Sequence, residues 1–332
     1  MTRVHSKSAG IASLCAAAVT LFGSALVVSA QESPRASSAA TAHSYAPTST
    51  PRSLPIFYDH ALAAQGFPSP LIKARIAGHE ATFIVDTGAA ANVLADWYVE
   101  VAGIPSAKAD STAVGTNGKT APERLAHRLQ GHWSDGQRFD LNEALVLAFP
   151  PYFKSLHLGG LVSPQALAPP GMAAVLDLRV PSLRFEPFAR ALADLRQATA
   201  PTIPIHLTEP CRNAKANKLA EYMAPVGAAG VTDLMMIDTG ATRTIFSDKS
   251  KIAHAIGSGR EVSTPTEGIG GDVTGERLVR NVQLLRGGRI VTLNPSIGEV
   301  SASCNRKGIL GMDALRSCLL ILGDKKMAFS CN

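Results

Sequence analysis

The sequence predicts a mainly β fold, built as two copies of one lobe and containing only a few short helices. Its 332 residues correspond to roughly two domains of about 150 residues each, and 46% of them are hydrophobic, which is enough to form a core. Most apolar runs are short, rich in Leu or β-branched residues, and bounded by Gly, Pro, Asn or Asp, as is typical of strands. Several motifs also occur twice, in the same order.

The repeated motifs indicate a duplicated domain. The second copy of each motif lies about 150 residues after the first, which is far longer than the period of a solenoid repeat. The pairs are residues 54–57 and 203–206 (LPIF and IPIH), 86–88 and 238–240 (DTG in both), 160–167 and 308–315 (GLVSPQAL and GILGMDAL), and 175–185 and 319–329.

Residues 1–30 have the features of a signal peptide. Arg3 and Lys7 precede an apolar stretch, residues 11–28, and small residues end it at Ala30. We expect cleavage after Ala30 and export to the periplasm or the medium, with no membrane span left afterwards. A retained membrane anchor is the alternative, although Gly and Ser residues dilute the apolar stretch.

The rest of the chain divides into a tail, two lobes and a connector. A helical spacing of apolar residues over residues 187–197, followed by a stretch that contains Pro, marks the boundary between the copies. Each lobe is expected to form a short helix after its DTG motif, at residues 97–102 and 249–256. The expected units are a flexible tail at residues 31–53, an N-terminal lobe at 54–187, a connector at 188–202 and a C-terminal lobe at 203–332.

The charge of the chain argues against nucleic acid as a partner. The formal net charge is +6, and two of the basic residues lie in the predicted signal peptide. Aromatic residues make up 5% of the chain and do not alternate with basic runs, as they do in many nucleic-acid-binding surfaces. We therefore expect no binding of nucleic acid.

Four cysteines follow the predicted signal peptide, and three pairings of them are possible. Residues 318–331 have the pattern of a hairpin that turns at residues 323–326, which puts Cys318 directly opposite Cys331, at a separation that a disulfide can bridge. Cys211–Cys304 then follows by elimination. Four reduced core cysteines are the alternative, which the predicted export disfavours.

The two DTG motifs are the candidate chemical site. Each follows a short apolar run, so each predicts a strand that ends in Asp and turns at Gly, where the chain packs closely or adopts positive φ. The Thr hydroxyl can fix one loop against its twin. Two such loops that meet on a twofold axis would bring the carboxyls of Asp86 and Asp238 face to face.

Two facing carboxyls can hydrolyse a peptide bond. Like charges so close cannot both be ionised near neutral pH, so the pair shares a proton. The ionised carboxyl can act as general base on a water while the protonated one polarises the scissile carbonyl. This chemistry requires no metal, no cofactor and no covalent intermediate.

These motifs resemble those of the retropepsin-like aspartic peptidases, in the fused two-lobe form of bacterial secreted proteins. The matching segments are residues 84–89 (IVDTGA), 236–241 (MIDTGA) and 309–313 (ILGMD), and the resemblance extends roughly over residues 54–331. It implies a two-lobed aspartic-peptidase fold and an aspartic endopeptidase that acts on polypeptides as a monomer. The site residues it implies are Asp86 and Asp238 as the catalytic pair, with Thr87, Gly88, Thr239 and Gly240 bracing the loops.

Two alternatives stay open. One is a catalytically silent binding module of the cell envelope that keeps the peptidase fold. The other is that each lobe pairs with a lobe of a second chain. Both Asp residues are present, which favours the active enzyme, because the loss of either one would abolish the chemistry.

The family also closes a Gly-rich hairpin, the flap, over its substrate. The segments that resemble it are residues 268–271 (GIGG) and 114–119 (VGTNGK), which makes Gly115, Gly118, Ile269, Gly270 and Gly271 flap candidates. The sequence departs from the family at Ser163, where the first lobe is expected to have Gly, and it has no evident flap tyrosine of the pepsin type.

Other motifs have simpler interpretations. Residues 115–120 (GTNGKT) resemble a phosphate loop, but Ala113 replaces its first Gly and no apolar strand precedes it, so a hairpin tip is favoured and no nucleotide is expected. The histidines lack metal-ligand spacing, so no metal is expected. Asp96, Asp248 and Asp313 are interpreted as helix caps or turn residues.

Overall fold

A computed structural model of the protein describes residues 53–64, 66–114, 120–200, 203–212, 220–257, 260–261, 267–268, 271–272, 276–301 and 303–331. All of them belong to one compact unit, Ser49–Asn332. The predicted signal peptide and, apart from Ser53, the predicted tail lie outside the described residues.

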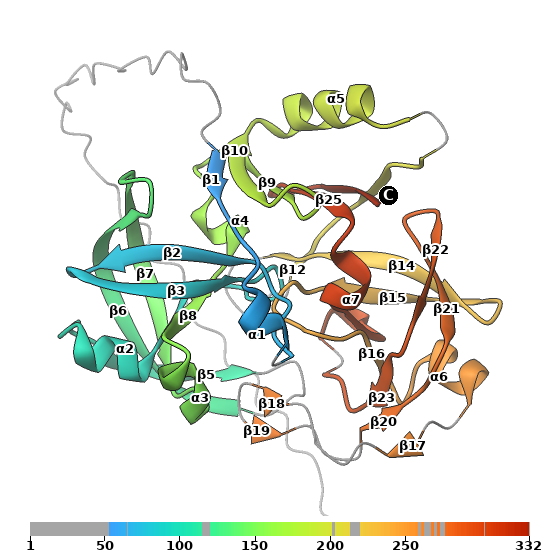
Figure 1. Ribbon diagram of the computed structural model, residues 1–332, viewed down its shortest axis with the longest axis horizontal. Coiled ribbons are helices and arrows are strands. Elements are labelled where there is room, and N and C mark those ends of the chain that lie inside the picture. Colours follow the sequence, from blue (N-terminus) through green and yellow to red (C-terminus); the bar gives the residue numbers. More distant parts are fainter. Residues whose placement is uncertain are drawn as a thin grey trace, which may run out of the picture. The chain divides into compact units, whose positions relative to one another are not determined.

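The N-terminal half forms a seven-stranded sheet, seen on the left of Figure 1. Strand β2 pairs with β6 as well as with β3, which curls the sheet into a barrel-like shape. In the order of the sheet, its strands are β2 (Leu71–Ile76), β3 (His79–Val85), β8 (Leu158–Val162), β4 (Val93–Ala95), β7 (Arg138–Leu147), β6 (Thr120–Trp133) and β5 (Ala107–Val114).

The C-terminal half forms a nine-stranded sheet that repeats the centre of the first. The run β2-β3-β8-β4-β7 recurs as β14-β15-β24-β16-β23, with the same parallel and antiparallel pairings. In sheet order the strands are β17 (Arg260–Glu261), β20 (Arg277–Leu278), β23 (Ser296–Gly298), β16 (Ile245–Ser247), β24 (Gly308–Leu310), β15 (Val231–Ile237), β14 (Met223–Ala228), β21 (Val282–Arg286) and β22 (Arg289–Leu293).

A six-stranded sheet joins the two halves. Strand β9 of the first half pairs with β25 of the second, and Leu176 lies opposite Leu320, which occupies the same place in the second copy. The twofold axis of the repeat therefore passes between these two leucines. In sheet order the strands are β1 (Ser53–Pro55), β10 (Ser182–Glu186), β9 (Ala173–Asp177), β25 (Cys318–Leu322), β26 (Met327–Cys331) and β11 (His206–Thr208).

Two small sheets and several short helices complete the described part. The hairpins are β12 (Cys211–Arg212) with β13 (Ala220–Glu221), and β18 (Glu267–Gly268) with β19 (Gly271–Asp272). The helices are α1 (His60–Ala64), α2 (Asp96–Val101), α3 (Pro151–Ser155), α4 (Pro164–Leu167), α5 (Phe188–Ala198), α6 (Lys251–Ile256), α7 (Met312–Leu315) and the 3-10 turn η1 (Ser303–Asn305). The prediction of a mainly β, two-lobed, duplicated fold with few short helices is confirmed.

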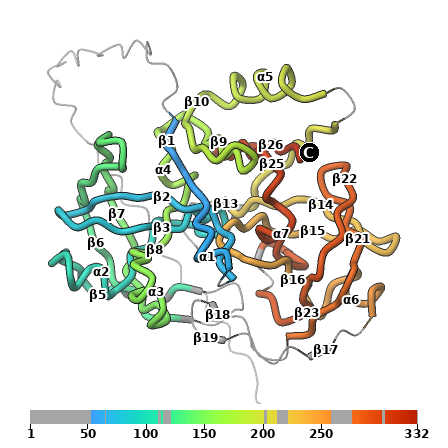
Figure 2. The backbone as a smooth tube through the Cα atoms, in the orientation of Figure 1, coloured from blue at the N-terminus to red at the C-terminus, as the bar shows by residue number. Residues whose placement is uncertain are grey.

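Helix α5 lies where the helical spacing was expected. It buries Ala191 and Leu195 against Ile321 and Ala328 of the joining sheet, which it covers at the top of Figure 1. Figure 2 shows the chain passing from the first sheet through β9, β10 and α5 into the second half.

The helices that follow each DTG loop begin differently. Asp96 is the first residue of α2, and its carboxylate accepts a hydrogen bond from the Trp97 N–H at 2.8 Å. Helix α6 is capped by Ser250, whose hydroxyl accepts from the Ala253 N–H at 2.9 Å. Asp248 precedes that cap in a turn.

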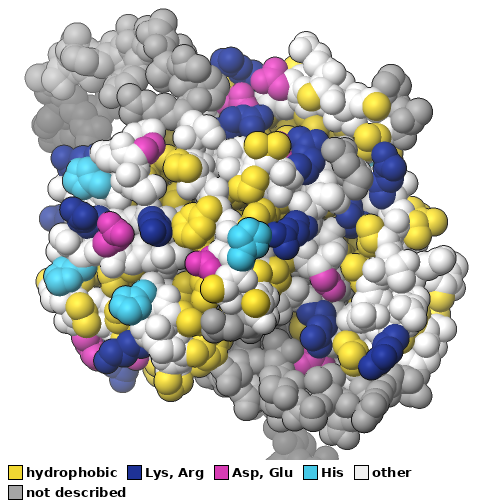
Figure 3. Space-filling view, in the orientation of Figure 1, with side chains coloured by type: hydrophobic (Ala, Val, Ile, Leu, Met, Phe, Trp, Pro, Cys, Tyr) yellow, Lys and Arg dark blue, Asp and Glu magenta, His cyan; other side chains and the backbone are white. Residues whose placement is uncertain are grey.

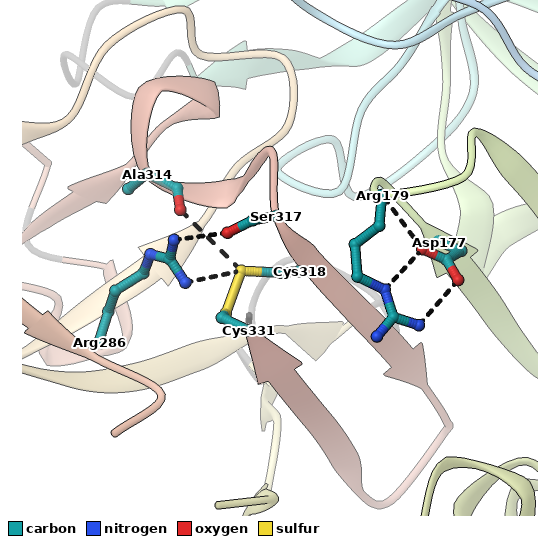
Figure 4. Close-up of a disulfide and its surroundings, with 7 residues drawn as sticks. All are labelled: Asp177, Arg179, Arg286, Ala314, Ser317, Cys318 and Cys331. Carbon is teal, nitrogen blue, oxygen red and sulfur yellow. Dashed lines mark hydrogen bonds and ion pairs between the residues drawn. A yellow bond between two sulfur atoms is a disulfide. The ribbon is translucent and has the colours of Figure 1, made fainter. Parts of the chain in front are cut away.

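Two disulfides are present, Cys211–Cys304 and Cys318–Cys331. Cys318 and Cys331 are register partners across the β25–β26 hairpin, and both are completely buried. Arg286 approaches this disulfide, as Figure 4 shows: its guanidinium donates to the Ser317 hydroxyl at 2.8 Å and to the Cys318 sulfur at 3.3 Å. Burial lowers the pKa of Arg286 to about 10, so the guanidinium stays charged at neutral pH.

Within the described ranges, no helix is both long and apolar enough to cross a membrane.

Candidate active site

The two DTG loops begin at equivalent ends of β3 and β15. The last strand residues, Val85 and Ile237, are completely buried. In each copy the backbone N–H of the aspartate extends the pairing with the neighbouring parallel strand. The Asp86 N–H donates to the Val162 carbonyl at 2.9 Å. Asp238 donates to the Leu310 carbonyl at 3.1 Å. Each carboxyl is thus delivered from a rigid buried strand to the start of a loop.

The two threonines lock the loops together. Each of Thr87 and Thr239 donates its backbone N–H to the hydroxyl of the other at 3.1 Å. The Thr87 hydroxyl donates in turn to the Ile237 carbonyl at 2.9 Å. The Thr239 hydroxyl donates to the Val85 carbonyl at 2.6 Å. Because both threonines are at most 2% exposed, water does not compete for these four bonds.

The locked loops bring Asp86 and Asp238 into side-chain hydrogen-bonding contact. The two residues are 8% and 5% exposed. Glycine is required beside each carboxyl, since a Cβ on Gly88 would lie 2.5 Å from the Asp238 Cγ and one on Gly240 would lie 2.6 Å from the Asp86 Cγ. The glycines therefore let each loop approach the opposite carboxyl.

One oxygen of each carboxyl is held by its own loop. The Asp86 Oδ1 accepts from the N–H groups of Gly88 at 2.8 Å and Ala89 at 3.2 Å. The Asp238 Oδ1 accepts from Gly240 and Ala241, both at 2.9 Å. These bonds fix the orientation of the two side chains symmetrically.

The pair binds a proton more strongly than ordinary carboxyls. Burial raises the pKa of Asp86, and the negative charge of Asp238 beside it raises it further. Burial also raises the pKa of Asp238, although the hydrogen bond from Asp86, the loop N–H groups and the charge of Arg306 oppose that rise. One proton shared between the two carboxyls is the state that burial and mutual repulsion favour.

Beneath the loops lies a second set of contacts that the sequence analysis missed. The Asn92 Oδ1 accepts from the Ser163 N–H at 3.0 Å, and the Thr244 hydroxyl accepts from the Gly311 N–H at 3.3 Å. Asn92 and Thr244 follow their DTG motifs at the same spacing, which is a signal that the sequence offered. Ser163 thus makes the same backbone contact as Gly311, its counterpart.

The helices after these contacts hold the loops in different ways. Gln165 donates from its side-chain amide to the carbonyls of Ala89 at 2.9 Å and Thr87 at 3.2 Å. Asp313, at the same place in the second copy, accepts from the N–H and hydroxyl of Thr244 at 2.9 and 2.7 Å. Asp313 is therefore a brace of the second loop.

The flap candidates are only partly visible. Gly271 pairs with Gly268 in the β18–β19 hairpin. Gly115, Gly118, Ile269 and Gly270 lie outside the described residues, although Val114 and Thr120, on either side of residues 115–119, pair as hairpin strands.

An open cavity of about 490 Å³ adjoins the loop that follows Asp238. It extends from Thr242 and Arg243 to the segment between α1 and β2, where Pro68 lines it. The next residue, Ser69, donates to the Gly240 carbonyl at 3.4 Å, so this segment reaches the DTG loop of the other half.

No metal centre is found in the part of the chain that the structure describes, where no three His, Cys, Asp or Glu side chains gather closely enough to hold an ion.

Comparison with known proteins gives one family and several similar folds. The Aspartyl protease family matches residues 72–143, the segment that contains Asp86. Among curated proteins no match is found. The family match is therefore confined to the first half of the chain.

Three solved structures resemble the chain at low identity. The aspartic proteinase from Irpex lacteus is 11% identical, with a TM-score of 0.49 over 85% of this chain and 98% of that one. Basic 7S globulin from soybean is 12% identical, with a TM-score of 0.44 over 84% of this chain and 94% of that one. Conglutin gamma from lupine seeds is also 12% identical, with a TM-score of 0.46 and the same coverage.

Proposed function

We propose that the protein is an aspartic endopeptidase in which Asp86 and Asp238 activate a water for attack on a peptide bond. The observation that carries this proposal is the contact between two buried carboxyls, held symmetrically by equivalent loops. A purely structural role gives no reason for this contact, because burying two like-charged groups against one another is costly.

The proposed reaction begins with the pair holding one proton. The ionised carboxyl takes a proton from a water molecule, and the oxygen of that water bonds to the scissile carbonyl carbon. At the same time the other carboxyl gives its proton to the carbonyl oxygen, which yields a tetrahedral diol. In the second step the C–N bond of the diol breaks. The carboxyl that took a proton from water gives it to the leaving nitrogen. The other carboxyl takes a proton back from a hydroxyl of the diol as the new carboxyl product forms. The pair then has its original single proton.

The substrate would be a polypeptide that crosses the site between the two halves. The cavity beside Thr242 and Arg243 offers room for a substrate side chain next to the loop of Asp238. The flap candidates Gly115, Gly118, Ile269, Gly270 and Gly271 would close over the peptide.

We also propose that the N-terminal lobe comprises residues 54–187, the connector residues 188–202 and the C-terminal lobe residues 203–332.

We also propose that the protein is exported to the periplasm or the medium and acts as a monomer. It would have no nucleic-acid or nucleotide partner. Two disulfides suit an oxidising compartment. One chain supplies both carboxyls, so no second copy is needed to complete the pair. On the face drawn in Figure 3, the described Lys and Arg side chains are scattered among other side chains, without a continuous basic stripe.

A digestion assay tests the proposal. The chain that begins after Ala30 is incubated with an unfolded protein from pH 3 to pH 8, with and without a transition-state mimic such as pepstatin. We expect cleavage between acidic and neutral pH that the mimic blocks. Tight binding of the mimic without any cleavage would instead identify a binding module, and cleavage that a metal chelator abolishes would contradict the proposal.

A further inference from the structure

The surroundings of the two carboxyls are unequal in one respect. Arg306, two residues before β24, is 6% exposed. Its Nη1 is 2.9 Å from the Met236 sulfur. Met236 precedes Asp238 by two residues, so the two side chains point to the same side of β15 and its continuation. The guanidinium therefore lies on the side of the strand from which the Asp238 carboxyl projects.

Arg306 is held in place by a carboxylate, a carbonyl and a nearby disulfide. Its Nη1 is 3.4 Å from Glu221 Oε2, and its Nε donates to the Ser301 carbonyl at 2.7 Å. Glu221 is the register partner of Cys211, which is bonded to Cys304. The disulfide thus fastens the turn that carries Arg306 to the hairpin that carries Glu221.

The first half has neither charge of this ion pair. Leu158, completely buried, occupies the place of Arg306 two residues before the repeated glycine. Ser69 occupies the place of Glu221, since each lies two residues before an equivalent strand residue. These strand residues are Leu71, which pairs with Ile84, and Met223, which pairs with Met236. The loops that hold the carboxyls are alike, but among the described residues a buried cation acts on the carboxyl of the second loop only.

We propose that Arg306 is a positioning residue that makes Asp238 the ionised member of the pair and leaves the shared proton on Asp86. This inference rests on the proposed function, because it assigns the general base to Asp238 and the general acid to Asp86. The reason is electrostatic: a positive charge that is buried away from water favours the ionised form of the nearer carboxyl.

The other charged groups around the site do not create this difference. Glu221 pairs with Arg306 and weakens its field, while the charge of Arg306 lowers the pKa of Asp238. Arg243 and Asp313 line the same cavity, and the charge of Arg243 lowers the pKa of Asp313. The Asp86 side is faced by the Asp238 carboxyl and by backbone N–H groups.

The test reads the two carboxyls directly by NMR of aspartate labelled with ¹³C at the carboxyl carbon, in the chain that begins after Ala30. The Asp86 and Asp238 signals are assigned by their loss in Asp86→Asn and Asp238→Asn. We expect Asp238 to be the carboxyl that ionises first as the pH rises. In Arg306→Met the first midpoint should rise by about one pH unit, a tenfold gain in proton affinity, and Arg306→Lys should shift it less.

Two further variants keep the test decisive. Glu221→Gln leaves Arg306 uncompensated and should lower the midpoint, and it carries the test if Arg306→Met does not fold. Arg286→Met is the matched control, because it removes another buried guanidinium that contacts Ser317 and Cys318 instead, and it should leave the midpoint unchanged. The inference is wrong if Asp86 ionises first, or if neither the Arg306 nor the Glu221 variant moves the midpoint.

This experiment separates the inference from the proposed function, because it needs no substrate. An unchanged midpoint in an active peptidase would overturn only the role of Arg306. The expected shift in a chain that cleaves nothing would support the role of Arg306 and overturn the peptidase.

Discussion

Thr87 and Thr239 exchange backbone-to-hydroxyl hydrogen bonds of equal length, 3.1 Å, across the axis that relates the two halves. Each hydroxyl then donates to the residue that precedes the opposite aspartate. The stability of the interface and the placement of the carboxyls consequently depend on the same four bonds.

Removing one of these hydroxyls should cost stability. Thr87→Val and Thr239→Val keep the shape of the side chain but leave a buried N–H and a buried carbonyl without partners, which should cost about 1–3 kcal/mol in each variant. Urea unfolding measures this loss, with Thr→Ser at the same positions as the control that keeps the hydroxyl. In the double variant the losses should not add, because the two residues form one network. Additive losses would show that the threonines act independently, and no loss would show that the four bonds do not stabilise the fold.

The two loop glycines should tolerate no side chain. Gly88→Ala and Gly240→Ala place a Cβ 2.5–2.6 Å from the opposite carboxyl carbon, so the loops must separate and the shared proton must be lost. We expect loss of peptide cleavage in both variants. Gly227→Ala is the control on β14, where the nearest atom to the new Cβ is 3.5 Å away, and it should stay active. Full activity in either loop variant would mean that the carboxyls need not touch.

The contribution of Asp86 and Asp238 to stability should fall as the pH rises above the ordinary pKa of aspartate. Both carboxyls have a raised pKa in the folded protein, so the folded state binds more protons than the unfolded state above pH 3.8. The stabilisation from protonation is complete below that pH and is lost as the pH rises through the raised values.

Urea unfolding from pH 3 to pH 8 measures this dependence. Asp86→Asn and Asp238→Asn should each reduce it, because the amide removes the repulsion between the carboxyls. A wild-type protein that gains stability over this range while the Asn variants do not would contradict the raised pKa values.

The two disulfides should contribute unequally. Cys211–Cys304 spans 93 residues and Cys318–Cys331 spans 13. In the loop-entropy picture the stabilisation grows from ~3 kcal/mol for a loop of about 15 residues to ~4.7 kcal/mol for about 100. Replacing both cysteines of a pair by Val should therefore destabilise the protein more for Cys211–Cys304. Urea unfolding of the two double variants decides this, and a larger loss for the hairpin pair would contradict the expectation.

The sequence was most informative where structure depends on local pattern. The strands that lead into Asp86 and Asp238, the α5 helix and the β25–β26 hairpin all follow from apolar spacing and turn residues within a short segment. The repeat then related the two halves, since equal motifs in equal order imply equal local folds.

The sequence was least informative where structure depends on distant pairing. The contact of Arg306 with Glu221 and the braces at Asn92 and Asp313 depend on strand register and on loops that meet only in the folded chain. The joining sheet brings β1 to β10 and β11 to β26, and no local pattern specifies those partners. Asp313 illustrates the difference, because its sequence position suggests a helix cap, whereas its carboxylate braces Thr244.

The most direct test of the dyad is a peptide-cleavage assay on the wild type, Asp86→Asn and Asp238→Asn, with unfolding measured on the same samples. An amide can neither take the proton of the water nor supply the acid proton, so each substitution should reduce turnover by at least about a thousandfold while the protein stays folded. Asp140→Asn is the matched control, because Asp140 is exposed and pairs only with Arg138 on the surface among the described contacts, and it should keep wild-type activity. Full activity in either Asn variant would remove that aspartate from the mechanism and contradict the dyad.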